Sequence, residues 1–257
     1  MKKKRTPEIR VAIQFYGDLT AIIPGNRKTS ILERTIPEPT SVKDLIEACG
    51  VPHTEIDLIL IDGRPVDFSF LIKKDGQIRV YPVFYDLDIP ENVRLQKRFI
   101  SSPRFLVDVN LGKLARYLRM AGFDSAYSNN ADDDELILQM QNEKRVLLTR
   151  DRKLLMHKVV KTGYWPRSDL PAEQFNEVLT RFDLFDEVNP YSRCINCNGV
   201  LKTVSKKDVI DQLEPLTKKH FNRFSQCPEC GQIYWAGSHR DRLDPILQNI
   251  FHQQDAD

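Results

Sequence analysis

The chain has 257 residues, of which 41% are hydrophobic and 29% charged, and its formal net charge at pH 7 is +2. This length predicts one large domain or two to three small ones. No apolar run is long enough to cross a bilayer, so we exclude an integral membrane protein and expect no membrane partner. Residues 1–5 are basic but lack the apolar core of a secretory signal, so we expect a cytoplasmic protein.

The charge is unevenly distributed. Lys and Arg outnumber Asp and Glu in residues 92–170 and again in residues 191–242. A basic field around a few clustered carboxylates suits a polyanionic substrate such as nucleic acid. The alternative is an ordinary solvated basic surface.

Residues 8–84 have the pattern of a small α+β domain. Ser41 begins a helix in capping-box form that Gly50 ends, and the pair Asp62-Gly63 predicts a hairpin turn. Alternating or continuous apolar residues predict strands at 9–15, 30–36, 56–61, 66–68 and 77–83. This order of elements is that of a β-grasp, or ubiquitin-like, module, which we place at residues 1–84.

The stretch around Asp62-Gly63 and Asp75-Gly76 resembles the small sulfur-carrier branch of that fold. Those carriers end in a diglycine whose carboxylate is activated, whereas here Val83 continues into more chain. We therefore expect a binding or structural role for this domain, such as recruiting a protein partner. Cys49 is expected to be a buried small hydrophobe.

Beyond this domain, strand, acid and helix repeat along the chain. The apolar runs 105–107 and 146–148 stop at Asp108 and Asp151, and a helical pattern follows each. In a parallel sheet both strands end at the same edge, so we expect the two carboxylates to converge there. A third acidic cluster, residues 132–135, opens the helix between them. Carboxylates from three places at one edge predict a divalent metal site.

The remaining pattern extends this α/β domain. Helices are expected at 111–118, 133–143, 152–160 and 171–182, and further short strands at 123–127 and 164–167. After a linker at 85–103, residues 104–190 are therefore expected to form a three-layer domain with a parallel sheet.

Each acid has a structural alternative. Asp108 and Asp151 can each cap the helix that follows, and Asn110 can cap in place of Asp108. Asp132 with Glu135 three residues later has the pattern of a capping box. The structural reading is therefore best for Asp132.

Asp134 is the first candidate ligand of that cluster and Asp133 the second, although acids in a first helical turn also complement the helix dipole. Asp169 is either a fourth acid or a turn residue. Arg150, Arg152, Ser168 and Asn110 are within reach of the same edge, where they can contact RNA phosphates. Arg116 is a further candidate for RNA binding.

Four of the five cysteines form two CxxC pairs, Cys194 with Cys197 and Cys227 with Cys230. Such pairs predict a zinc ribbon, whose four thiolates close a tetrahedral structural site and leave His220 and His239 without a ligand role. We place the ribbon at residues 191–257, with a helical insert at 205–224 and a C-terminal helix at 242–251.

Aromatic and basic side chains interleave beside the second pair. Tyr234 and Arg240 are candidates for RNA stacking and phosphate contact. The alternative is that Tyr234 and Trp235 pack the small core of the ribbon.

The run 105–151, with the core DVNLGKLARYLRMAGFD and the later LLTRD, resembles the PIN-like ribonuclease domain first described at the C-terminus of mut-seven type exonucleases. That family joins the nuclease to a zinc ribbon, and its bacterial members often carry an N-terminal ubiquitin-like domain. The resemblance implies that Asp108, Asp134 and Asp151 hold Mg²⁺ or Mn²⁺, with Asp169 in a variable fourth place.

We therefore expect a metal-dependent ribonuclease that hydrolyses RNA phosphodiester bonds, with zinc in a structural role. The sequence shows no Ser-His-Asp or Cys-His arrangement that competes, and His157 is expected to be a surface residue. The alternative is an RNA-binding adaptor that has kept the fold without catalysis.

Overall fold

The computed structural model describes residues 8–23, 31–83, 89–96 and 103–235. The chain divides into two units. The first combines residues 1–99 with 149–167, and the second combines residues 100–148 with 168–257. The segment that follows Asp151 therefore belongs to the unit that contains the N-terminal domain.

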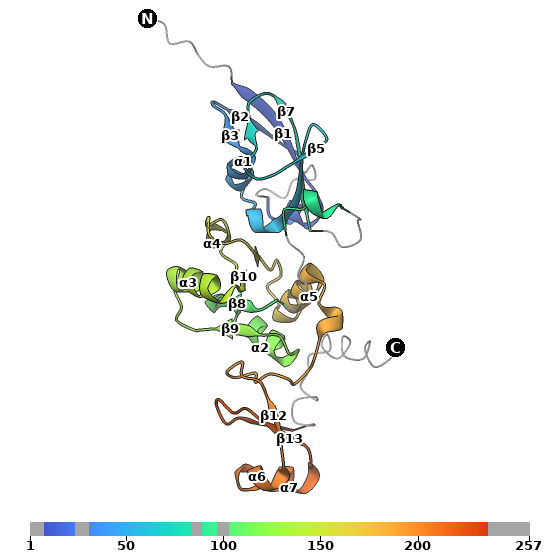
Figure 1. Cartoon of the computed structure of the whole chain (residues 1–257), viewed down its shortest axis with the longest axis vertical. Helices are drawn as coiled ribbons and strands as arrows, with labels where there is room; N and C mark the ends of the chain where they lie inside the picture. Colours follow the sequence, from blue (N-terminus) through green and yellow to red (C-terminus); the bar gives the residue numbers. More distant parts are fainter. Residues whose placement is uncertain (1–7, 24–30, 84–88, 97–102, 236–257) are drawn as a thin grey trace, which may run out of the picture. The chain divides into compact units, whose positions relative to one another are not determined.

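The first unit is built on a five-stranded sheet in the order β2-β1-β7-β4-β5 (Figure 1). Strands β1 and β7 run parallel, and the other neighbours are antiparallel. The helix α1 supplies buried side chains to the same core. The elements are β1 (Ile9–Phe15), β2 (Ile31–Ile36), α1 (Val42–Ala48), β4 (Ile56–Ile61), β5 (Arg64–Val66), β7 (Gly76–Pro82) and the short pair β3 (Thr40–Ser41) and β6 (Leu71–Ile72). This arrangement confirms the ubiquitin-like prediction.

Local signals place these elements. In β1 the buried residues alternate with more exposed ones, as the sequence predicted. Ser41 Oγ accepts a hydrogen bond from the backbone N of Asp44 at 3.0 Å and so begins α1. Asp62 and Gly63 both have positive φ, 49° and 79°, which fits the tight turn between β4 and β5. The second hairpin strand starts at Arg64, two residues earlier than expected.

Residues 149–167 add α4 (Arg152–Leu155) and β11 (Gly163–Tyr164) to the first unit. The predicted helix through Val160 was too long, because only four residues are α-helical. Turns follow instead, and the carbonyl of Val160 lies 2.7 Å from His53 Nε2 of the ubiquitin-like domain. A nonlocal contact at Val160 therefore accompanies the early end of the helix.

The second unit contains a parallel sheet in which β10 and β9 flank β8. In Figure 1, α3 and α5 lie on opposite sides of these strands. The rings of Phe105 and Phe182 meet at 5.7 Å, and those of Tyr117 and Phe175 at 6.0 Å, so α2 and α5 share one core. The elements are β8 (Phe105–Val107), α2 (Gly112–Met120), β9 (Ser125–Tyr127), α3 (Asp133–Glu143), β10 (Val146–Leu148) and α5 (Pro171–Phe182). The predicted α/β domain with a parallel sheet is confirmed.

The ribbon is the remainder of the second unit. Three antiparallel strands lie in the order β12-β13-β14 and pack with the helical insert around a small core of Val209, Leu213, Phe224 and Ile233. Its elements are β12 (Lys202–Val204), α6 (Lys206–Val209), α7 (Pro215–His220), β13 (Phe224–Gln226) and β14 (Ile233–Trp235). The helical insert is present, whereas the helix expected at 242–251 lies outside the described residues.

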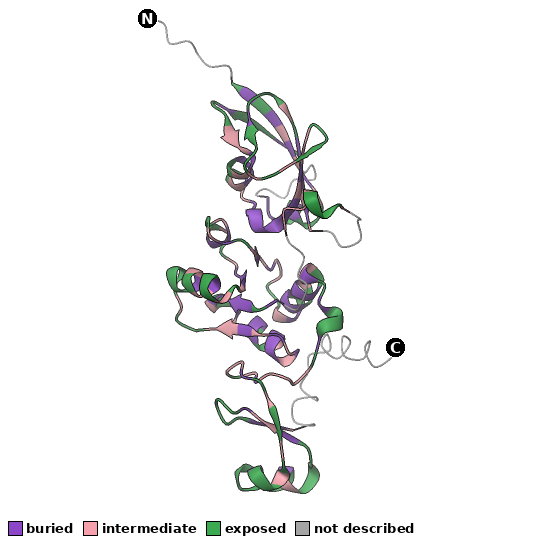
Figure 2. Ribbon diagram, viewed as in Figure 1, coloured by how far each residue is buried: buried purple, intermediate pink, exposed green. Residues whose placement is uncertain are grey.

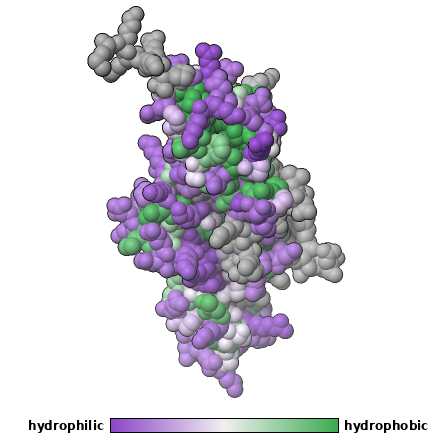
Figure 3. Space-filling view, turned by 45° about the horizontal axis from the view of Figure 1, so that its top comes forward, coloured by the Kyte–Doolittle hydropathy of each residue, from purple (hydrophilic) through white to green (hydrophobic). Residues whose placement is uncertain are grey.

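Burial follows these cores. Buried residues line the sheets and the inner sides of the helices, and exposed residues cover α6 and α7 (Figure 2). Single apolar side chains such as Leu216 and Leu138 remain 72% and 60% exposed, and Figure 3 shows a face on which hydrophilic residues predominate. Scattered exposures of this kind do not define a binding surface. None of the helices within the described part of the chain is both long and apolar enough to cross a membrane.

Candidate functional site

Asp108 stands directly after β8 and is 6% exposed. Its backbone N donates to the carbonyl of Leu148 at 3.0 Å, so it lies in register with the end of β10. The short turn Val109–Leu111 follows, and the Asp108 side chain makes no capping hydrogen bond to it. Leu111 occupies the N-cap position of α2, also without a side-chain cap. Helix capping by the side chain was the alternative role for Asp108 and Asn110, and neither N-cap position here has a side-chain capping hydrogen bond.

The turn after Asp108 depends on a glycine that sequence analysis did not single out. A Cβ atom at Gly112 would lie 2.5 Å from the hydroxyl oxygen of Tyr127. That hydroxyl donates to the carbonyl of Val109 at 3.1 Å. Glycine at this position therefore lets β9 support the turn that carries Asp108.

The acidic cluster begins α3. Asp132 accepts from the backbone N of Glu135 at 2.9 Å, and Glu135 accepts from the backbone N of Asp132 at 3.2 Å. This confirms the capping box. Asp133 and Asp134 lie exposed in the first turn.

Asp151 does cap a helix. Its Oδ1 accepts from the backbone N atoms of Lys153 at 2.7 Å and Leu154 at 3.3 Å. A carboxylate offers two oxygens with about four acceptor sites. The cap on α4 uses Oδ1, so capping and metal ligation are compatible at this residue.

The candidate acids are shared between the two units. Asp108, Asp133, Asp134 and Asp169 belong to the second unit, where the described side chains that gather closely enough to hold a metal are the cysteines and not these acids. Asp151 belongs to the first unit. The site for Mg²⁺ or Mn²⁺ therefore stays a prediction.

The residues before α5 form a turn. Asp169 is exposed, and the neighbouring Ser168 hydroxyl donates to Glu173 Oε2 at 2.5 Å and accepts from the backbone N of Leu170 at 3.0 Å. The backbone N of Ser168 donates to Glu177 at 2.8 Å. Ser168 thus helps to begin α5.

The basic residues proposed for RNA contact have different surroundings. Arg116 is exposed on α2. Arg152 donates from Nη1 to the carbonyl of Ile22 at 2.7 Å, and its guanidinium lies 5.4 Å from the ring centroid of Trp165. The carbonyl of Arg150 accepts from Trp165 Nε1 at 3.1 Å. The segment around Asp151 is therefore held by contacts within the first unit.

A buried acid of the ubiquitin-like domain also contacts this segment. Glu55 is 1% exposed and accepts from the backbone N of Trp165 and from Arg167 Nη2, both at 2.7 Å. Asp18 lies 2.9 Å from the same Arg167 nitrogen. Burial lowers the pKa of Arg167, but the charges of Glu55, Tyr164 and Asp18 outweigh it and raise the pKa above its usual value. Sequence analysis missed Glu55 because no local pattern marks its partner.

The four cysteines do gather. Their Sγ atoms all lie within 4.8 Å of one another, with Cys194 and Cys230 at 3.5 Å and Cys197 and Cys227 at 3.4 Å. A Zn–S bond of about 2.3 Å in a tetrahedron requires sulfur atoms about 3.8 Å apart, so this donor set fits zinc.

The thiols are tuned by their neighbours. Burial raises the pKa of Cys194, but hydrogen bonds, first that from the Tyr234 hydroxyl, lower it to about 7. Burial and the adjacent sulfurs raise the pKa of Cys197 to about 12. A cation at the centre would favour the thiolate form of all four. A Cβ at Gly199 would lie 2.9 Å from Cys227 Sγ, so the knuckle needs glycine there.

Tyr234 belongs to the interior of the ribbon. It is 6% exposed, and its hydroxyl lies 3.1 Å from Cys194 Sγ and accepts from the backbone N of Ile195 at 3.1 Å. Trp235 and Phe221 pack with ring centroids 6.4 Å apart. The packing alternative therefore describes both aromatics, while RNA contact by Tyr234 stays untested. Arg240 and His239 lie outside the described residues, and His220 is exposed at the end of α7.

A polar network joins the ribbon to the α/β domain. Asp124 accepts from Arg145 at 2.6 Å and from Asn198 at 2.8 Å, and lies 3.4 Å from Arg193. Arg119 donates to the carbonyls of Ser125 and Asn196, both at 2.8 Å. The first zinc knuckle is therefore anchored on α2 and β9.

These features define a protein with a ubiquitin-like domain, an α/β domain with a parallel sheet, and a four-cysteine metal knuckle. The family described as Mut7-C RNAse domain matches residues 103–247, and the family described as Mut7-C ubiquitin matches residues 8–88. The first match covers more than half of the chain. The chain therefore belongs to the Mut7-C RNase domain family.

No curated protein matches the chain. Among solved structures, the chain is similar to "Putative molybdopterin converting factor, subunit 1" from Pyrococcus furiosus, with 21% identity over 30% of this chain and 99% of that one. The TM-score is 0.24, which does not establish a shared fold.

Proposed function

We propose that the protein is a metal-dependent ribonuclease that hydrolyses RNA phosphodiester bonds. The observation that supports this most is Asp108, a buried carboxylate at the end of a parallel strand that is not used to cap the following turn. A carboxylate at the carboxyl end of a strand in a parallel sheet lies where such folds bind ligands, and its oxygens are the ligands that Mg²⁺ and Mn²⁺ prefer. Membership of the Mut7-C RNase domain family is consistent with this role.

Asp108, Asp134 and Asp151 would hold the catalytic ion, with Asp133 and Asp169 as alternative ligands. When bound, Mg²⁺ or Mn²⁺ would activate a water and neutralise charge on the phosphate. Asp151 would contribute through the oxygen that its helix cap leaves, because Oδ1 is bonded to the backbone of α4.

RNA would be held by cations around the acids. Arg116 is exposed, so its guanidinium group suits a phosphate. Arg150 is half-buried, and Arg152 is already bonded to Ile22 through one nitrogen, so each would contribute less. The zinc ribbon would add binding surface through its basic residues, with zinc in a structural role only. The ubiquitin-like domain would present its surface to a protein partner.

The test is cleavage of internally labelled RNA by the full chain in Mn²⁺ and in EDTA. We compare the wild type with Asp108→Asn, which keeps the side-chain shape, and with Asp186→Asn, an exposed acid near the end of α5. We expect the wild type and Asp186→Asn to cleave in Mn²⁺ only, and Asp108→Asn to be slower on the order of 10²-fold or more.

Equal RNA loss with wild type and Asp108→Asn would remove the nuclease proposal. RNA binding without cleavage by any form would instead support a silent RNA-binding adaptor.

A further inference from the structure

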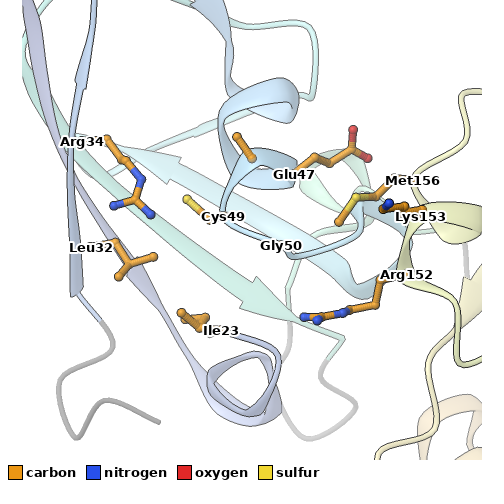
Figure 4. Close-up of a pocket in the computed structure, with 10 residues that line it drawn as sticks. Ile23, Leu32, Arg34, Glu47, Cys49, Gly50, Arg152, Lys153 and Met156 are labelled. Atoms are coloured by element: carbon orange, nitrogen blue, oxygen red, sulfur yellow. The ribbon is translucent and has the colours of Figure 1, made fainter. Parts of the chain in front are cut away.

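A cavity of about 510 Å³ opens within the first unit (Figure 4). It lies among β2, the end of α1 and α4, and its size falls in the range of small-molecule sites. Ile23, Leu32 and Met156 give it apolar walls. In Figure 4 the guanidinium groups of Arg34 and Arg152 enter it from different walls.

Arg34 is exposed on the edge strand β2, but it lies on the same side of the strand as two buried residues. It pairs with Val11 in the register of β1 and β2, and its neighbours Leu32 and Ile36 on the same side of β2 are 5% and 8% exposed. Side chains at i and i+2 of a strand share a face, so Arg34 lies on the core side of the sheet. One alternative is that an inward-pointing charge on an edge strand merely prevents edge-to-edge aggregation. That role does not require further cations on the facing wall of the cavity.

Such cations are present. Arg152 and Lys153 of α4 line the same cavity as Arg34. The acid among the lining residues, Glu47, is already paired with Lys43 at 3.1 Å and with His53 at 2.7 Å. Arg152 uses one nitrogen for the carbonyl of Ile22, and a guanidinium has five N–H donors. The cavity therefore carries an excess of positive charge that its own acid does not neutralise.

We propose that this cavity binds a phosphate monoester attached to an apolar or aromatic body, which is the chemistry of a nucleoside monophosphate. Two guanidinium groups suit a phosphate, because each can donate two parallel hydrogen bonds to its oxygens. The apolar walls suit a base or sugar face. The same chemistry occurs in a free mononucleotide and at the 5′-phosphate end of an RNA strand. The site does not depend on the proposed cleavage activity.

The test is isothermal titration of the zinc-loaded full chain without Mg²⁺ or Mn²⁺, so a failure here leaves the nuclease proposal untouched. The probes are adenosine 5′-monophosphate, adenosine, and one short oligoribonucleotide with either a 5′-phosphate or a 5′-hydroxyl. We expect the monophosphate to bind at least about tenfold more tightly than adenosine.

Arg34→Gln and Lys153→Gln should each weaken binding of the monophosphate about tenfold. The matched control is Arg10→Gln, which removes the same charge from an exposed position of β1 that alternates away from Val11. Circular dichroism checks the fold of each variant, and Lys153 provides a second variant on an exposed side chain if Arg34→Gln unfolds.

Two positive outcomes separate the sources. If the 5′-phosphorylated oligonucleotide binds like the monophosphate and better than its 5′-hydroxyl form, the site accepts RNA ends, and if only the monophosphate binds, it accepts free nucleotides. The proposal is overturned if neither phosphate monoester binds at millimolar concentration, or if Arg34→Gln and Lys153→Gln bind as tightly as Arg10→Gln.

Discussion

The cysteine knuckles and the candidate aspartates are two ways of building a metal site. The two cysteines of each CxxC pair are separated by only two residues. The ribbon of β12 to β14 brings the two pairs together, so that all four Sγ atoms lie within 4.8 Å of one another. The aspartates come from the ends of separate strands and helices and from both units. A site built from local turns can be deduced from spacing alone, whereas a site built from residues far apart in the sequence also depends on contacts that no local pattern marks.

The largest expected effect is on the local site. Cys227→Ser should remove zinc and unfold the ribbon, because the apparent binding free energy of structural zinc, about 10–16 kcal/mol in small zinc domains, is folding free energy. Metal analysis should show about one zinc per wild-type chain and almost none in the variant. Cys49→Ala is the control, since Cys49 is buried in the ubiquitin-like core. Full zinc content in Cys227→Ser would contradict a four-thiolate site.

The second prediction concerns how the Asp151 segment is held. Glu55→Gln leaves Arg167 and Trp165 without the buried carboxylate that they share. Breaking one partner of a buried pair should lower the free energy of unfolding by about 3–5 kcal/mol. Urea unfolding measures the loss, and hydrogen exchange should accelerate in residues 149–167. Glu38→Gln, at an exposed position, should change neither, and an equal effect of both variants would show that Glu55 has no special role.

A smaller effect is expected at the turn that carries Asp108. Gly112→Ala places a methyl group 2.5 Å from the Tyr127 hydroxyl oxygen, so the turn or the ring must move. Overpacking of this kind typically costs about 1–3 kcal/mol, measured by thermal or urea unfolding. Adding Tyr127→Phe should recover part of the loss because it removes the nearest atom. If the losses in free energy of unfolding of the two single variants simply add in the double variant, residue 112 and the Tyr127 hydroxyl do not interact.

The smallest effect depends on pH. Burial raises the pKa of Asp124, but hydrogen bonds from Arg145 and Asn198 outweigh it and hold the pKa below the ordinary value of 3.8. A carboxyl group whose pKa is lower in the folded than in the unfolded protein stabilises the fold at any pH above its unfolded-state pKa. This contribution is lost as the pH falls through its lower folded-state pKa. At pH 7, Asp124→Asn should cost about 0.5–1.5 kcal/mol. The difference from wild type should shrink in unfolding experiments below pH 3.8, and a constant difference would argue against the pairing.

The same contrast explains what sequence analysis could predict. The Ser41 cap, the Asp132–Glu135 capping box and the Asp62-Gly63 turn depend on residues within three positions of one another, and all are present. The CxxC pairs were predictable for the same reason.

Nonlocal contacts were not predictable. The contact of Glu55 with Arg167 joins residues 112 positions apart, and that of His53 with Val160 joins residues 107 apart. The early end of α4 and the need for glycine at position 112 also depend on such contacts. The role of the aspartates belongs to this second group.

The most direct test of whether distant carboxylates share one cation is a titration of the zinc-loaded chain with Mn²⁺. Electron paramagnetic resonance measures the concentration of free Mn²⁺ at each step. Asp108→Asn and Asp151→Asn are titrated beside wild type and Asp186→Asn. We predict that wild type and Asp186→Asn bind Mn²⁺ alike and that each of the other two substitutions weakens the same site at least about tenfold. Unchanged Mn²⁺ binding in Asp108→Asn and Asp151→Asn would contradict the account.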